Sequence, residues 1–95
     1  MRRRYLVTYD VSDDKRRTGV FTTLMGNGDH VQFSVFLCEL NDRELAELKG
    51  RLAQTVNQRQ DQIIILDLGA AEHDLKAVLQ CLGKAYEPPS RILVV

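Results

Sequence analysis

The stretch Tyr5–Arg17, YLVTYDVSDDKRR, decides how this chain is organised. Its first half, Tyr5–Val11, is β-prone and apolar on both alternating faces, apart from one carboxylate near its end. Strands that are covered on both sides have this composition, so we expect this one to lie centrally in a sheet. The question that it raises is why Asp10 ends a run that otherwise looks buried.

The second half of the stretch predicts the start of a helix. Ser12 is a suitable N-cap, and Asp13 and Asp14 fall in the first turn, where the helix dipole favours anions. Apolar residues at helical spacing carry the helix to residue 24 or 25. Gly19 lies inside it and costs about 1 kcal/mol relative to alanine, for a reason that the sequence does not supply.

The middle of the chain contains a strand region and a second helix. Residues 30–40 alternate in polarity, which fits one long strand or a hairpin that turns near Ser34 and Val35. Asn41 and Glu44 then have the spacing of a capping box, and leucines at helical spacing extend this helix to about residue 57.

The last third predicts a buried strand over residues 63–68, a helix over 70–82, a loop, and a terminal strand over 91–95. With the hairpin counted as two strands, the order is βαββαβ with an extra C-terminal strand. This is the ferredoxin-like arrangement of the α+β class, in one domain over residues 1–95. Both helices would cover one face of an antiparallel sheet.

The opposite face of the sheet would also need a cover. We expect Leu6, Phe36 and Leu40 to lie there, and a second copy of the chain is the simplest partner. A chain of 95 residues also gains from oligomerisation, because a small domain buries a modest fraction of its surface. The sequence therefore predicts a homodimer.

Composition limits the function classes. The 95 residues carry 13 basic and 13 acidic side chains, so the zero net charge does not by itself predict nucleic-acid binding. Basic residues nevertheless cluster at Arg2–Arg4 and at Lys15–Arg17. The two cysteines, Cys38 and Cys81, are too few for a disulfide scaffold, and we expect both to be buried thiols. Without a signal peptide or membrane span, the expected location is the cytoplasm.

Asp10 is the candidate catalytic residue. It can be a simple turn former, but Ser12, Asp13 and Asp14 already fill the capping roles, so its carboxylate is surplus to local needs. One carboxylate is a weak Mg²⁺ site. If a dimer axis passes nearby, a second copy supplies another, and one ion can orient water against a phosphodiester.

Arg16 and Arg17 are the candidate nucleic-acid contacts beside Asp10. They follow the carboxylate by six and seven residues, at the basic start of the predicted helix, and guanidinium groups bind phosphate oxygens well.

Four segments make the chain resemble a known family. YLVTYDVSDDKRR, GDHVQFSVFLCEL, LDLG and LGKAYEPPSRILVV together closely resemble the Cas-two family of CRISPR-associated adaptation proteins, which are small endonucleases. The resemblance covers essentially the whole chain. Asp at the strand end, Arg on the first helix and the QxSVF string are specific in combination.

The resemblance implies a ferredoxin-like homodimer with its site at the dimer interface. It matches Asp10 to the proposed magnesium ligand, Arg17 to the helix arginine, and Ser34 and Phe36 to supporting residues. It also implies a hairpin within residues 30–40 and a terminal strand that extends a sheet across the dimer.

Two departures from the family bear on function. Some relatives carry arginine where this chain has Gly19 and His30, so fixed positive charge is absent from the expected cleavage site. This favours the first of the two roles that the resemblance implies: a dimeric adaptor that holds two dimers of the CRISPR integrase (the Cas-one family) apart on foreign DNA. The second role is Mg²⁺-dependent cleavage of RNA or double-stranded DNA.

Two further interpretations stay open at this point. One is a toxin-type RNA interferase of the same fold, which neighbouring genes would separate from the CRISPR roles. The other is a regulatory domain that binds a small ligand, against which the surplus Asp10 and the arginines argue.

Overall fold

The computed structural model describes residues 1–88 and contains four strands and three helices in that range. In chain order the elements are β1 (Arg3–Asp10), α1 (Asp14–Met25), β2 (Asp29–Gln32), β3 (Val35–Leu40), α2 (Asp42–Thr55), β4 (Gln62–Ala70) and α3 (Leu75–Val78). Within this part of the chain no helix is long and apolar enough to cross a bilayer.

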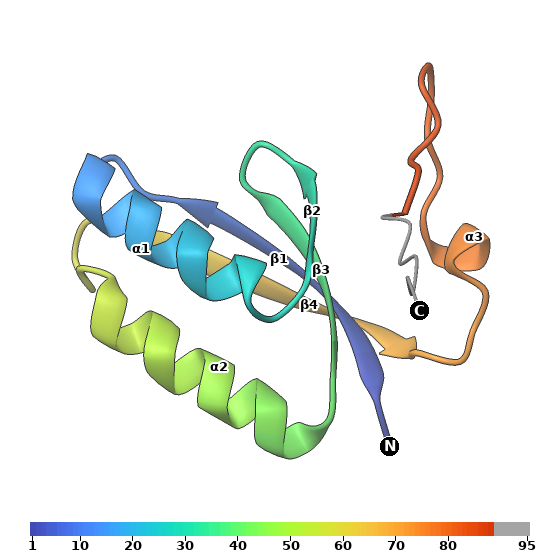
Figure 1. Ribbon diagram of the computed structural model, residues 1–95, viewed down its shortest axis with the longest axis horizontal. Helices are drawn as coiled ribbons and strands as arrows, with labels where there is room; N and C mark the ends of the chain where they lie inside the picture. The colour runs from blue at the N-terminus through green and yellow to red at the C-terminus, as the bar shows by residue number, and fades with distance from the viewer. Residues whose placement is uncertain (89–95) are drawn as a thin grey trace, which may run out of the picture.

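The four strands form one antiparallel sheet in the order β2-β3-β1-β4. β1 is therefore an inner strand that is hydrogen-bonded on both sides, as its doubly apolar sequence predicts. α1 and α2 lie together on one face of the sheet, while α3 lies apart from them (Figure 1). This order of strands and helices confirms the predicted ferredoxin-like βαββαβ arrangement.

The core lies between the sheet and the two long helices. The strand register brings Val7 opposite Phe36 and Tyr5 opposite Cys38, so these side chains share the helix-covered face. α1 contributes Val20 to this core. The fully buried side chains are Val7, Val20, Leu24, Phe36, Cys38 and Leu48. Burial raises the pKa of the Cys38 thiol to about 11, with a smaller contribution from Asp29.

The prediction for the open face is wrong for two of its three residues. Phe36 and Leu40 are buried on the helix-covered face, at 0% and 3% exposure. The hairpin turns at Phe33–Ser34, and the pairing of Leu6 with Leu37 then places Leu37, rather than Phe36, beside Leu6. The open face carries Leu6, Val35, Leu37, Ile64 and Leu66.

Several predicted features are confirmed, and others differ in the structure. Of the two alternatives for residues 30–40, the structure has the hairpin. α1 ends at Met25, and the capping box of Asn41 and Glu44 is present with both hydrogen bonds. The N-cap of α1 is Asp13 instead of Ser12, because the Asp13 carboxylate accepts a hydrogen bond from the backbone N–H of Arg16 at 2.9 Å. Cys81 is exposed, contrary to expectation.

The predicted helix over 70–82 is mostly wrong, since only Leu75–Val78 is helical. β4 continues to Ala70 by pairing with Arg3. Beyond it, the guanidinium of Arg4 donates hydrogen bonds to the carbonyls of Ala71 and His73. These contacts bind residues 71–73 to the sheet instead of to a helix. The predicted strand over 91–95 lies outside the described residues.

Gly19 has a packing role that the sequence does not reveal. A Cβ atom at this position would lie 2.9 Å from the Thr55 methyl carbon of α2, which is closer than real Cβ contacts come. The missing side chain therefore allows α1 and α2 to approach each other. Gly50, in the middle of α2, has no atom within 4 Å of the same virtual Cβ and serves as a matched comparison.

We predict opposite effects for alanine at these two helical glycines. Gly50→Ala should stabilise the fold by about 0.5–1 kcal/mol through helix propensity alone. Gly19→Ala should lose that gain, because displacing the Thr55 methyl costs about 1–3 kcal/mol. Combining Gly19→Ala with Thr55→Ser should recover it. Urea unfolding measures all three, and equal stabilisation by both alanines would show that Gly19 has no packing role.

Candidate strand-end site

Asp10 is the last residue of β1 and is exposed. It lies opposite Gln62 of β4, and its carboxylate has no hydrogen-bond or ion-pair partner among residues 1–88. Beside it, the backbone N–H of Tyr9 donates to the carbonyl of Ser34 at 3.2 Å, which ties the strand end to the β2–β3 turn. The structure thus presents an unneutralised carboxylate at the exit of the inner strand.

Arg17 is held beside that exit. Its Nη1 donates to the carbonyls of Val11 and Ser12, both at 3.1 Å, and its Nη2 pairs with Asp14. The side chain remains 38% exposed. Arg17 is therefore fixed by the two residues that follow Asp10, and solvent still reaches its guanidinium.

Arg16 points to a different partner. Its Nε donates to Oδ2 of Asp61 at 2.7 Å, and its Nη2 contacts Gln60 at 3.1 Å. The Asp61 side chain is fully shielded from solvent, and the backbone N–H of Asn57 donates to the same Oδ2 at 2.8 Å. Arg16 thus joins the start of α1 to the α2–β4 loop. Its expected contact with nucleic acid stays a prediction.

The charge pair affects both of its members. The hydrogen bond from Arg16, followed by that from the Asn57 backbone, holds the pKa of Asp61 below its usual value. The same hydrogen bond to Asp61 raises the pKa of the Arg16 guanidinium. Both groups are therefore charged at neutral pH, and the pair acts as a structural clamp.

Ser34 and Phe36 occupy different environments. Ser34 lies in the turn and reaches the site through its backbone carbonyl, which binds Tyr9. Phe36 is fully buried, and its ring packs against Tyr9, Phe21 and His30 at centroid distances of 6.4, 5.6 and 4.8 Å. Phe36 therefore supports the site from beneath and does not line its surface.

One chain offers a single carboxylate for a metal ion here. No group of three or more His, Cys, Asp or Glu side chains suited to a metal gathers within residues 1–88. Of the nearby acids, Asp13 caps α1, Asp14 pairs with Arg17 and Asp61 pairs with Arg16. Only the Asp10 carboxylate is left to act as an oxygen ligand, which fits a Mg²⁺ site completed from a second chain.

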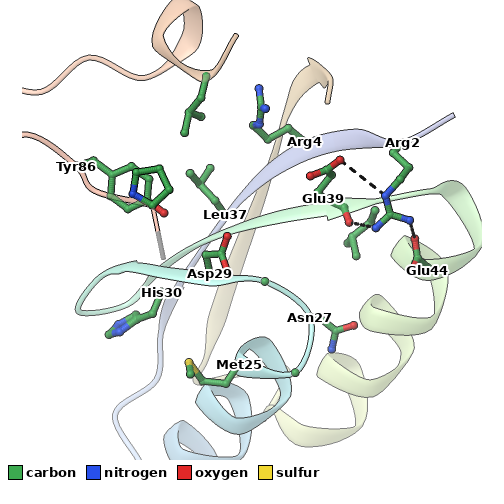
Figure 2. Close-up of a pocket in the computed structure, with 15 residues that line it drawn as sticks. Arg2, Arg4, Met25, Asn27, Asp29, His30, Leu37, Glu39, Glu44 and Tyr86 are labelled. Carbon is green, nitrogen blue, oxygen red and sulfur yellow. Dashed lines mark hydrogen bonds and ion pairs between the residues drawn. The ribbon is translucent and has the colours of Figure 1, made fainter. Parts of the chain in front are cut away.

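The N-terminal arginines are also compensated inside the protein. Arg2 reaches Glu39 and Glu44, and Arg3 pairs with Asp67 at 2.9 Å. Figure 2 shows the contacts of Arg2 at the border of an open depression of about 890 Å³, which also includes Arg4 and Tyr86. Its lining includes neither Asp10 nor Arg17.

Sequence reasoning missed three residues near the site. Asp61 lies between the predicted second helix and the predicted strand over 63–68, and its pairing with Arg16 spans 45 positions that no local pattern links. Asp14 was assigned to the helix dipole but also neutralises Arg17. Phe33 is 87% exposed in the hairpin turn, and an apolar aromatic residue in a turn is the signal that would have identified it.

The fold and the site define a class of protein. They describe a small ferredoxin-like α+β protein with an unpaired carboxylate and an arginine at the exit of its inner strand. The family model for CRISPR associated protein Cas2 matches residues 1–75. The chain belongs to the Cas2 family.

Individual relatives agree with this assignment. The chain is 39% identical over 87 residues to "CRISPR-associated endoribonuclease Cas2 1" of Rhodospirillum rubrum, covering 92% of this chain and 84% of that protein. It is 34% identical over 91 residues to "CRISPR-associated endoribonuclease Cas2" of Geobacter sulfurreducens, covering 96% and 95%. A crystal structure described as cas2 superposes with a TM-score of 0.74 at 28% identity, covering 98% of this chain and all of that one.

We predict that the clamp between Arg16 and Asp61 makes stability depend on pH. Because the pKa of Asp61 is lowered in the folded state, its stabilising contribution is complete above the unfolded carboxyl pKa of about 3.9. It is lost as pH falls through the lower folded pKa. The melting temperature of Asp61→Asn should therefore lie below that of the wild type at pH 7, with the gap narrowing below pH 4.

Asp10→Asn is the matched control for this comparison. It removes an exposed carboxylate that has no partner within residues 1–88, so without added metal it should not show the gap at pH 7 that narrows below pH 4. A gap for Asp61→Asn that stays constant from pH 7 to pH 3 would contradict the clamp.

Proposed function

We propose that this protein acts as a homodimeric, Mg²⁺-dependent CRISPR-associated endoribonuclease, in which Asp10 of each copy contributes one metal ligand. The observation that carries the proposal is the state of Asp10. Among the acids next to the strand exit it alone has no partner in the described chain, while Asp13, Asp14 and Asp61 are all engaged. An exposed carboxylate without a structural role is available for a ligand.

The open face of the sheet supports the homodimer. Ile64 and Leu66 are 43% and 47% exposed there, next to Leu6 of the inner strand. A contiguous apolar face on one side of a sheet is a typical site for a second layer, and the family assignment makes a second copy a consistent partner. The dimer also provides the second carboxylate that a Mg²⁺ site of this kind requires.

The chain's own residues have defined tasks in this proposal. The ion, when bound, would neutralise phosphate charge and lower the pKa of a bound water. The Asp10 carboxylates would hold and orient it. Arg17, fixed by the carbonyls of Val11 and Ser12 and still partly exposed, would contact a phosphate oxygen of the substrate.

We infer RNA as the substrate from the names of the relatives. Those of Rhodospirillum rubrum and Geobacter sulfurreducens are named as endoribonucleases, and the match to them covers more than nine tenths of this chain. The family assignment also favours a CRISPR-associated role over the toxin-type RNA interferase.

A dimeric adaptor between two dimers of the CRISPR integrase on foreign DNA is the second candidate. The observation that favours it is charge compensation. Arg16 is bound to a shielded carboxylate and Arg17 is paired with Asp14, so neither supplies a full free charge to a transition state. An adaptor needs only backbone contacts, which weaker and more distributed charges can provide.

Substitution of Asp10 separates the two candidates. The wild type, Asp10→Ala and the near-isosteric Asp10→Asn should be assayed with Mg²⁺ on single-stranded RNA and on double-stranded DNA. We expect the wild type to cleave RNA and both variants to lose at least about 100-fold in rate, because a lost metal ligand costs at least as much as a lost outer-shell partner. Unfolding curves and sedimentation should show that both variants remain folded and dimeric.

Two results would reject the endoribonuclease. One is equal cleavage by all three proteins, which would identify a contaminating nuclease or a different site. The other is no cleavage by any of them combined with unimpaired binding of double-stranded DNA, which would leave the adaptor as the function.

A further inference from the structure

We propose that a pocket under the β2–β3 turn binds the base of an unpaired nucleotide, a proposal that rests on RNA binding in the proposed function. The pocket has a volume of about 220 Å³, below the roughly 300–1,000 Å³ typical of drug-sized ligands, so it suits a single ring system. We call it the aromatic pocket. It is lined by Tyr9, Arg17, Thr18, Phe21, His30 and Phe33.

Phe33 is the first observation that points to a ligand. Its side chain is 87% exposed in the loop that joins β2 and β3, which projects from the sheet in Figure 1. Burying a phenylalanine side chain is worth about 1.5–3 kcal/mol, so an exposed one at a turn is a position where a ring can still gain a stacking partner. Nucleobases stack on exposed aromatic side chains of this kind.

The opposite wall of the pocket is formed by aromatic rings in contact with one another. The His30 ring lies 5.3 Å from Phe21 in an edge-to-face arrangement and 4.8 Å from the buried Phe36. Its Nε2 donates to the carbonyl of Phe33 at 3.1 Å, since a carbonyl can only accept. This bond links the His30 ring to the turn that carries Phe33. The aromatic surfaces are therefore preorganised, which reduces the entropy lost on binding.

Arg17 supplies the charge complementarity that selects a nucleotide. Arg17 lines the same pocket as Phe33, and its guanidinium is held by the carbonyls of Val11 and Ser12. An aromatic surface beside a partly exposed guanidinium matches a base attached to a phosphate. A purely apolar partner, such as the same region of a second copy, would cover the exposed part of this guanidinium without offering it a further hydrogen-bond acceptor.

The pocket is connected to the strand-end site. Tyr9 lines it and directly precedes Asp10, and the Tyr9 backbone N–H binds the carbonyl of Ser34, the neighbour of Phe33. A base stacked on Phe33 would therefore place its own backbone near Arg17 and the exit of β1. The pocket would position the strand, and it would favour unpaired RNA because a paired base is not free to enter.

Tryptophan fluorescence gives a direct test, because the chain contains no tryptophan. Phe33→Trp introduces a single reporter at the proposed stacking position. It should be titrated with a pentauridine RNA and with an oligomer of equal length and charge that lacks bases. Met25→Trp is the matched control, because Met25 is also an exposed apolar residue but does not line the aromatic pocket.

We expect pentauridine to quench Phe33→Trp and to leave Met25→Trp nearly unchanged, while the abasic oligomer quenches neither. In polarisation assays at fixed salt, the wild type should bind the base-bearing RNA about 5- to 150-fold more tightly than the abasic one. Phe33→Ala should abolish that ratio, and Phe33→Tyr should retain it. Phe33 is so exposed that truncation should leave unfolding curves unchanged.

The result that overturns the pocket is equal affinity of the wild type for both oligomers, or a ratio that survives in Phe33→Ala. A change in the sedimentation of Phe33→Ala with the ratio intact would instead assign Phe33 to a contact between copies. Cleavage that depends on Asp10 is measured separately. If Asp10-dependent cleavage persists while the affinity ratio is absent or does not depend on Phe33, the pocket is rejected and the proposed function stands. If the Phe33-dependent ratio is observed but cleavage does not depend on Asp10, the pocket stands and the proposed function is rejected.

Discussion

Antiparallel pairing of β1 on both of its edges is the constraint on which the rest of the structure depends. β3 and β4 pair with it in registers that turn Tyr5, Val7 and Tyr9 toward the helices. A one-residue slip would move all three aromatic and aliphatic side chains to the open face. The same pairing fixes where the strand ends, and so it fixes the place of Asp10.

The residues that follow use that strand end as an anchor. Arg17 binds the carbonyls of Val11 and Ser12, and the turn at Ser34 binds the backbone of Tyr9. The carboxylate of Asp10, the guanidinium of Arg17 and the aromatic pocket therefore gather at one end of one strand. A backbone hydrogen bond fixes the strand end to the turn, and the Arg17 side chain is held there by two backbone carbonyls.

Charge compensation explains why Asp10 is distinctive in a chain with equal numbers of acidic and basic residues. Five ion pairs around the sheet and helix ends neutralise four arginines that the sequence suggests are free. The pairs are Arg2 with Glu39 and Glu44, Arg3 with Asp67, Arg16 with Asp61, and Arg17 with Asp14. What remains at the strand exit is one carboxylate and a partly neutralised arginine, a combination better suited to holding a cation than to attracting polyanions over long distance.

Local signals in the sequence were sufficient for much of the fold. The capping box of Asn41 and Glu44 is formed by residues three apart, so it could be predicted from spacing alone. The inner position of β1 followed from its apolar residues on both faces. The order of elements and the Asp10 carboxylate at the strand end were likewise predictable.

Contacts distant in sequence account for the failures. Phe36 and Leu40 were assigned to the wrong face because their orientation depends on where the hairpin turns, which alternation alone does not fix. Most of the predicted helix over 70–82 does not form, because Arg4 donates hydrogen bonds to the carbonyls of Ala71 and His73. These two residues lie 67 and 69 positions after Arg4 in the sequence. The partner of Arg16 was missed for the same reason.

The central claim is that two chains share one metal ion through their Asp10 carboxylates. The stoichiometry of Mn²⁺ binding, followed by electron paramagnetic resonance of the free ion, tests it most directly. The account predicts one tightly bound ion for every two chains of the wild type and none for Asp10→Asn under the same conditions. One ion per chain, or equal binding by the variant, would contradict it.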